Sequence, residues 1–157
     1  MGTSPAAGDK APDFDLPTET GRVSLASLKG KAVVLYFYPK DDTSGCTAEA
    51  QAFTAQAAAF EKAGAVVVGV SKDSVKRHVN FRTKYELAVT LASDEAGETV
   101  ERYGVWIEKS MYGRKYMGIE RATFLIDKTG VIRQVWHKVK VPGHADEVLN
   151  SVRKLNG

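Results

Sequence analysis

The sequence contains a single cysteine, Cys46, and its surroundings predict a reactive thiol. Cys46 follows an apolar run, residues 32–38, and a loop, residues 40–45, and it opens a stretch whose apolar residues recur with helical spacing. A thiol in the first turn of a helix lies beside unpaired backbone N–H groups and the positive end of the helix dipole. Both favour the thiolate, which is the nucleophilic form of cysteine. Nucleophilic or redox chemistry is therefore the function that this position indicates.

A plainer interpretation of Cys46 is an inert core residue, because it shares one helical face with Ala50, Phe53, Ala57 and Phe60. The loop before it favours the reactive interpretation, since ligands of open α/β sheets gather beyond the carboxyl ends of parallel strands. Thr43 precedes Cys46 by three residues. We expect its hydroxyl to donate a hydrogen bond into the cavity that holds the thiol, and simple helix capping is the alternative role.

The elements that position Cys46 form a strand–helix–strand unit. The continuous apolar run Ala32–Tyr38 predicts a strand buried on both faces, which Pro39 ends. A helix is expected from the loop to about Ala63, and a second buried strand follows at Ala65–Val70. Two strands joined by a helix pair in parallel through a right-handed crossover.

The rest of the chain predicts an α/β domain with a thioredoxin-like fold, a central mixed β-sheet flanked by helices, spanning residues 1–157 as a single domain. Its first 20 residues suggest an extended leading segment. The remaining expected elements are a helix at Ser71–Tyr85, a short helix capped by Asp94 and ending near Gly104, a β-hairpin of Ala122–Ile126 and Val131–Trp136, and a C-terminal amphipathic helix containing Val148, Leu149, Val152 and Leu155.

Composition excludes several classes of protein. A lone cysteine cannot form an intramolecular disulfide, a four-cysteine zinc site or a C-x-x-C pair, so a reducing cytoplasm is the expected compartment. No apolar run reaches the roughly 20 residues of a membrane helix. The start, Met1–Pro5, lacks the pattern of a secretory signal. A net charge of +3 over 157 residues does not indicate nucleic-acid binding.

The three histidines predict neither a metal site nor a cofactor site. His78, His137 and His144 are scattered, without the spacing of a metal-binding motif, and surface positions are the expectation for all three.

Several stretches of the sequence resemble peroxiredoxins. The pattern Pro39-x-x-x-Thr43-x-x-Cys46 resembles their active-site signature, and YFYPKDDTSGCTAEA, residues 36–50, is similar to the Q-type branch, also called bacterioferritin comigratory proteins. The similarity continues at residues 69–74, 118–127 and 138–145.

This resemblance implies a thiol-dependent peroxidase without a cofactor. Cys46 would attack a peroxide and become a sulfenic acid. Arg121 would stabilise the thiolate and the leaving oxygen, although a surface arginine is the alternative. Thr43 would bind the peroxide oxygens, Pro39 would shield the thiolate, and the N–H groups of Gly45 and Cys46 would complete the oxygen site.

Glu49 matches an acidic position that many Q-type members carry. It lies three residues after Cys46, on the same side of the expected helix. A carboxylate beside a thiolate is unfavourable unless it pairs with Arg121 or turns aside. A catalytic role and an orienting role are both open.

The sequence departs from the family pattern at three positions. Ser44 replaces a usual proline, while Gln51 and Arg82 occupy the two positions where relatives carry a resolving cysteine. An external thiol must therefore reduce the sulfenic acid: glutathione with glutaredoxin, thioredoxin, or Cys46 of a second copy. The resemblance implies a monomer that reduces hydrogen peroxide and organic hydroperoxides.

A second function remains open besides this peroxidase. It is a peroxide sensor, in which oxidised Cys46 forms a mixed disulfide with a partner protein.

The stretch Met111–Gly118 is expected to be an exposed loop or hairpin near Arg121. Tyr112, Tyr116 or Trp106 would then line a substrate entrance, and an ordinary turn is the alternative.

Overall fold

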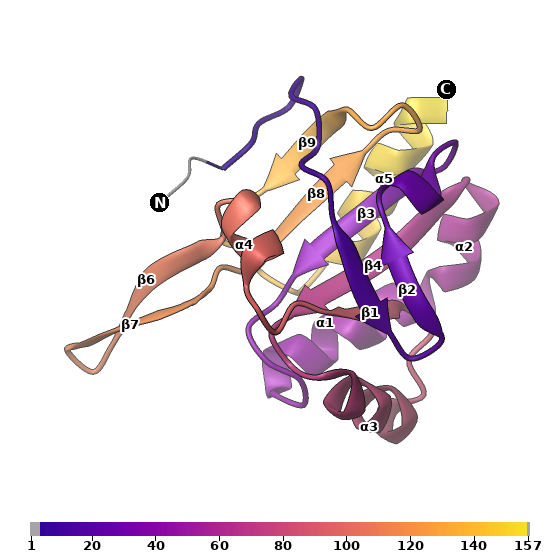
Figure 1. Cartoon of the computed structure of the whole chain (residues 1–157). Coiled ribbons are helices and arrows are strands. Elements are labelled where there is room, and N and C mark those ends of the chain that lie inside the picture. Colours follow the sequence, from indigo (N-terminus) through magenta and orange to yellow (C-terminus); the bar gives the residue numbers. More distant parts are fainter. Residues whose placement is uncertain (1–3, 157) are drawn as a thin grey trace.

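The computed structural model describes residues 4–156, and a mixed five-stranded sheet forms its centre (Figure 1). The strand order is β5-β4-β3-β8-β9. The bounds of these strands are β3 Ala32–Phe37, β4 Ala65–Ser71, β5 Thr90–Ser93, β8 Ala122–Ile126 and β9 Ile132–Trp136. The α/β architecture with a mixed sheet confirms the expected fold class.

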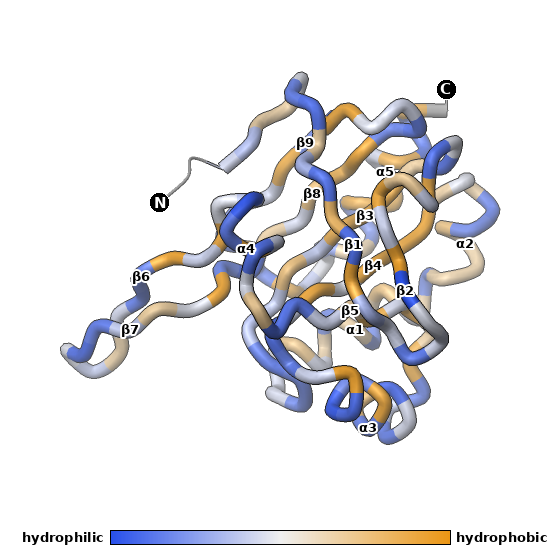
Figure 2. Tube along the Cα trace, viewed as in Figure 1, coloured by the Kyte–Doolittle hydropathy of each residue, from blue (hydrophilic) through white to orange (hydrophobic). Residues whose placement is uncertain are grey.

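Strand β3 is the middle of the sheet, and all six of its residues are buried. It pairs in parallel with β4 and antiparallel with β8, which in turn pairs antiparallel with β9. The parallel unit and the later hairpin are thus confirmed. Both faces of β3 are covered, so its sequence is apolar throughout instead of alternating. Figure 2 shows this apolar character along the central strands.

Two hydrophobic cores lie on opposite faces of the sheet. One contains Val34 and Tyr36 of β3 with side chains from four helices, and the other contains Leu35 and Phe37 with side chains from a β-hairpin and a short helix. The four helices are α1 Ser44–Ala55, α2 Ala57–Lys62, α3 Val75–Tyr85 and α5 His144–Asn156. The opposite face is covered by β1 Asp15–Thr18, β2 Gly21–Ser24 and α4 Glu98–Arg102 (Figure 1).

The single helix expected as far as Ala63 is wrong. Gln56 interrupts it with φ −103° and ψ 8°, and its N–H donates to Phe53 in an i to i−3 bond, which tightens the turn and ends α1. The helix expected from Ser71 begins later, at Val75. Ser71 still belongs to β4, and Ser74 caps α3 by accepting the N–H of Arg77.

The leading segment also differs from expectation. Residues 1–3 lie outside the described part of the chain, and β1 and β2 form an antiparallel hairpin, which the scattered prolines obscured. The expected cap of α4 is wrong as well, because Gly97 is the N-cap residue. Asp94 instead reaches past it and accepts the N–H of Val100 at 2.9 Å.

The stretch Met111–Gly118 belongs to a β-hairpin, which was one of the two expected forms. Its strands are β6 Trp106–Met111 and β7 Arg114–Ile119, and they project from the body of the molecule (Figure 1). Between residues 4 and 156, no helix is long and apolar enough to cross a membrane.

Candidate active site

Cys46 lies in the first turn of α1, beyond the end of β3. Thr43 is the N-cap residue, and the N–H of Thr47 makes the first helical bond, to the Thr43 carbonyl at 2.8 Å. The N–H groups of Gly45 and Cys46 therefore have no acceptor within the helix. Cys46 itself is 1% exposed. The sulfur is thus buried beside the positive end of a helix.

Arg121 contacts this sulfur although 75 residues separate it from Cys46. Its Nη2 lies 3.4 Å from the Cys46 Sγ, and its Nη1 donates to Glu49 Oε1 at 2.7 Å. The sheet explains the approach, because Ala122 pairs with Phe37 and so places Arg121 where β3 enters the loop. Burial lowers the pKa of Arg121, but Cys46 and Glu49 outweigh it and the pKa is raised. The guanidinium therefore carries a permanent charge.

Gly45 permits the close approach of Arg121. A Cβ at Gly45 would lie 3.0 Å from Arg121 Nη2, a distance tighter than most real contacts. A larger residue would displace the guanidinium from Cys46. Gly45 therefore has a steric role in addition to its free N–H group.

Glu49 is buried on the same helix and pairs with Arg121 through Oε1. Its Oε2 has no hydrogen-bond partner among the described residues. Burial raises the pKa of Glu49 to about 7, although Arg121 opposes this shift. Near neutral pH, the carboxyl group therefore exists in both protonation states.

Tyr36 completes this buried cluster, and sequence reasoning did not identify it. Its ring stacks on Phe53 at 4.7 Å, and its hydroxyl has no partner within residues 4–156. Burial, followed by the charges of Glu49 and Cys46, raises the pKa of Tyr36 well above its usual value, so the phenol stays neutral. The sequence held one signal for this packing, Gly69 in the valine-rich run that forms β4. A glycine inside a strand often marks a place where another group approaches the backbone closely.

Thr43 and Pro39 lie in the loop before the helix. Thr43 is exposed, and its hydroxyl donates to the Lys40 carbonyl at 2.9 Å, not into the cavity as expected. Within the described chain its side chain also makes no capping bond to the helix. Pro39 is partly buried, two residues after the end of β3.

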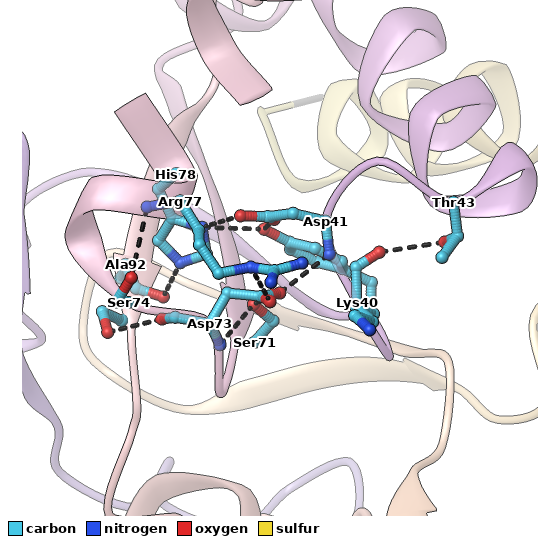
Figure 3. A network of polar contacts seen from close by, with 11 residues as sticks. Lys40, Asp41, Thr43, Ser71, Asp73, Ser74, Arg77, His78 and Ala92 are labelled. Carbon is cyan, nitrogen blue, oxygen red and sulfur yellow. Dashed lines mark hydrogen bonds and ion pairs between the residues drawn. The ribbon is translucent and has the colours of Figure 1, made fainter. Parts of the chain in front are cut away.

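A buried polar network supports the same loop (Figure 3). Asp41 Oδ1 accepts from the hydroxyl of Tyr38 at 2.5 Å, and its Oδ2 lies 2.6 Å from His78 Nδ1. The backbone N–H of Asp41 donates to Asp73 at 2.8 Å. Sequence reasoning missed this network because its partners come from separate elements.

The expectation that the three histidines lie at the surface is wrong for two of them. His78 and His144 are buried, and only His137 is substantially exposed, at 45% of its side chain. His144 contacts Thr123 at 2.8 Å, and burial lowers the pKa of His144 to about 4. Each buried ring has a polar partner inside the protein, which compensates for its removal from water.

Asp41, Asp73 and His78 bring potential metal-ligand atoms within 4.8 Å of one another. Hydrogen bonds from Tyr38 and Ser71, the Asp41–His78 contact and an ion pair between Arg77 and Asp73 already engage these atoms. The cluster is therefore explained as a hydrogen-bond network.

The β6–β7 hairpin approaches the site through a lysine. Tyr112 is 98% exposed at the hairpin turn, and Tyr116 is 44% exposed. Burial and then the charge of Arg121 lower the pKa of Lys109, while Cys46 acts in the opposite direction. Lys109 is thus within electrostatic range of both Arg121 and Cys46. Trp106 lies under a different lysine, Lys72, at 4.3 Å.

Comparisons with known proteins show the family of this chain. The sequence model of the AhpC/TSA family matches residues 7–135, so the chain belongs to that family. A Coxiella burnetii protein named as a bcp peroxiredoxin is 57% identical over 143 residues, covering 90% of this chain and 95% of that protein. Peroxiredoxin Bcp of Bacillus subtilis is 45% identical over 150 residues, covering 95% and 96%.

Solved structures lead to the same group. The crystal structure of a cysteine-to-serine variant of Xylella fastidiosa PrxQ covers 99% of this chain and 100% of its own, with a TM-score of 0.93 and 38% identity. Bacterioferritin comigratory protein of Xanthomonas campestris covers 92% of each chain, with a TM-score of 0.87 and 43% identity. The protein is a peroxiredoxin related to the Bcp and PrxQ proteins, and it is an enzyme of the thiol peroxidase class.

Proposed function

We propose that this peroxiredoxin reduces hydrogen peroxide and organic hydroperoxides through a sulfenic acid at Cys46. The observation that carries the proposal is the 3.4 Å contact between Arg121 Nη2 and the buried Cys46 Sγ. The thiolate attacks the terminal peroxide oxygen, an S–O bond forms and the O–O bond breaks. The leaving alkoxide or hydroxide takes up a proton, and the cysteine sulfur is oxidised to sulfenic acid.

The neighbouring groups then have separate roles. Arg121 stabilises the thiolate and the negative charge that develops on the leaving oxygen. The N–H groups of Gly45 and Cys46 bind peroxide oxygen. The Thr43 hydroxyl donates to the Lys40 carbonyl, which leaves its oxygen free to accept a hydrogen bond from the peroxide. Pro39 limits the access of water to the loop.

Glu49 acts mainly by orienting Arg121. Its Oε1 holds Nη1 at 2.7 Å, so that Nη2 is left for the sulfur. A planar guanidinium held at one nitrogen loses most of its rotational freedom, which fixes the direction of the other.

An external thiol completes the cycle. The chain contains no second cysteine, and Gln51 and Arg82 are both exposed residues without redox chemistry. The thiol attacks the sulfur of the sulfenic acid and releases water, which leaves a mixed disulfide, and a second thiol then regenerates Cys46. Glutathione with glutaredoxin is our first choice and thioredoxin the second. A small thiol suits a cysteine residue that is only 1% exposed.

Two further parts of the proposal concern the setting. We propose that the protein acts as a monomer. We also propose that it works in a reducing compartment such as the cytoplasm, because the cycle consumes thiols. Organic hydroperoxides are included since the Xanthomonas campestris relative is described for alkyl peroxide reduction.

The test is a peroxidase assay with glutathione plus glutaredoxin or thioredoxin as the reductant, with intact-mass analysis of the oxidised protein. We expect a mass increase of one oxygen at Cys46 after one equivalent of peroxide, turnover with thiol, and loss of both in Cys46→Ser. A stable stoichiometric adduct without turnover would support a peroxide sensor instead. An unchanged mass would contradict both functions.

A further inference from the structure

We propose that helix α3 clamps the loop that carries Cys46, and that His78 is the positioning residue of this clamp through its buried pair with Asp41. The proposal rests on the proposed function for its effect on peroxide reduction. The clamp itself can be measured without any peroxidase activity. Four observations support it.

The loop between β3 and α1 is short and is held from its middle. Asp41 belongs to this loop but is only 3% exposed, which is unusual for a charged loop residue. Its two carboxylate oxygens and its backbone N–H all have partners, Tyr38, His78 and Asp73 (Figure 3). Asp41 is therefore a fixed point five residues before Cys46.

The two ring nitrogens of His78 both face acceptors. Nε2 lies 3.1 Å from the carbonyl oxygen of Ala92 on β5, which can only accept, so Nε2 carries a proton. Nδ1 lies 2.6 Å from Asp41 Oδ2, a distance that also requires a proton between the two atoms. The pair thus shares one proton in addition to the proton on Nε2. A short charge-assisted bond of this kind is stronger and more directional than a neutral one.

A second attachment joins the same two elements at the surface. Asp42, with φ 59°, accepts from the Tyr85 hydroxyl at 2.6 Å and from Lys84 Nζ at 2.9 Å. Lys84 and Tyr85 belong to the last turn of α3, whereas His78 belongs to its first half. Consecutive loop residues are therefore fastened to both parts of one helix.

The fourth observation connects the clamp to the thiol. The Thr43 hydroxyl donates to the carbonyl of Lys40, which closes the loop between Asp41 and the start of α1. Movement of Asp41 would therefore move Thr43, the N-cap residue of the helix that carries Cys46. The clamp keeps the sulfur buried against Arg121, which favours its reaction with peroxide over its alkylation.

The experiment compares two reactions of Cys46 in the full chain, oxidation by hydrogen peroxide and alkylation by iodoacetamide. In His78→Gln we expect peroxide oxidation to slow and alkylation to accelerate, each by about tenfold, because the buried pair is lost. Alkylation is also measured against urea concentration. A locally opened loop gives an accelerated rate that is nearly independent of low urea, whereas access through global unfolding depends steeply on it.

Arg82→Gln is the matched control on the same helix, since Arg82 pairs only at the surface, with Glu19 at 3.4 Å. Both of its rates should stay within about twofold of the wild type. Asp42→Asn weakens the surface attachment, because it removes the negative charge and one of the two acceptor oxygens. It leaves no buried charge, and it should shift both rates in the same directions as His78→Gln but less. This variant carries the test if His78→Gln does not fold.

Asp41→Asn and the double variant Asp41→Asn/His78→Gln test whether the two residues act through their mutual contact. We expect the effect of the double variant on each rate to be smaller than the sum of the two single effects, because each substitution removes the same contact. Unchanged alkylation in both His78→Gln and Asp42→Asn would overturn the clamp, as would a purely urea-dependent increase. If the wild-type Cys46 does not react with peroxide, the proposed function fails, and the alkylation experiment still decides the clamp.

Discussion

Glu49 and Arg121 form a partly buried ion pair, with 2.7 Å between Oε1 and Nη1, and the other terminal nitrogen of Arg121, Nη2, contacts the sulfur of Cys46. The two nitrogens of Arg121 are thus divided between a fixed carboxyl group and the reacting atom. The pair joins α1 to the start of β8, which are adjacent in space but 72 residues apart in sequence. The reactivity of Cys46 therefore depends on residues that the active-site loop does not contain.

Replacing Arg121 by lysine should slow peroxide reduction strongly. Lysine keeps the charge but lacks the fork that contacts sulfur and carboxylate together, so we expect a loss of about a hundredfold or more. Stopped-flow measurement of the second-order rate constant with hydrogen peroxide checks this. Arg114→Lys, at an exposed position of β7, is the control. A similar loss in the control would show that the effect is not local to Cys46.

The pKa of Glu49 makes the stability of the protein depend on pH. Burial raises this pKa from 4.5 to about 7, so the folded protein binds more protons than the unfolded chain between these values. The stabilisation is complete below about pH 4.5 and is lost as pH rises through about 7. The expected loss is roughly 3 kcal/mol.

Urea unfolding of wild type and Glu49→Gln at pH 5 and pH 8 measures this loss. The lowered pKa of His144 changes stability in the opposite direction in both proteins. The contribution of Glu49 is therefore the difference between the two pH dependences, because the amide of Glu49→Gln does not titrate. The neighbouring exposed residue offers the control Gln51→Glu, which should retain the wild-type difference. A pH dependence that is equal in wild type and Glu49→Gln would assign the effect to another group.

Gly69→Ala should destabilise the fold through Tyr36. A Cβ at position 69 would lie 2.6 Å from Tyr36 Cζ, so the ring must move, at a cost of about 1–3 kcal/mol. The free energy of unfolding in urea is the measurement. Adding Tyr36→Leu to Gly69→Ala should recover part of the loss, since the smaller side chain leaves space for the methyl group. No recovery would place the strain elsewhere in β4.

Lys109 should accelerate the reaction of Cys46 with peroxide through its charge. Lys109→Met is expected to lower the rate by less than about tenfold, because the interaction acts over a distance, and to weaken the effect of added salt on the rate. The control is Lys115→Met on the same hairpin, where the lysine is exposed and pairs with Glu108 at 3.7 Å. Equal effects of the two substitutions would indicate a general charge effect.

Sequence analysis succeeded where the signal was local. The apolar run of β3, the position of Cys46 in the first helical turn and the β8–β9 hairpin depend on neighbouring residues, and the structure has them. Arg121 came from resemblance to a family. Its contact with Cys46 requires the register of β3 against β8, which no local pattern encodes.

The missed features depend on packing between distant segments. The Asp41–His78 pair requires α3 to lie beside the loop, and the Tyr36–Gly69 contact requires the parallel register of β3 and β4. The break at Gln56 has no glycine or proline to mark it. His78 and His144 were expected at the surface but are buried, because burial of a polar ring depends on hydrogen-bond partners that only the fold supplies.

The exposed β6–β7 hairpin and the guanidinium beside the sulfur share one stretch of backbone, with only Glu120 between the end of β7 and Arg121. Glu120 is anchored there, since its N–H donates to the Val105 carbonyl at 2.7 Å and its carboxylate contacts His137 at 2.6 Å. Bending of the hairpin therefore stops at Glu120. The anchored Glu120 thus separates the projecting hairpin from Arg121, so the position of the guanidinium does not depend on where the exposed tip lies.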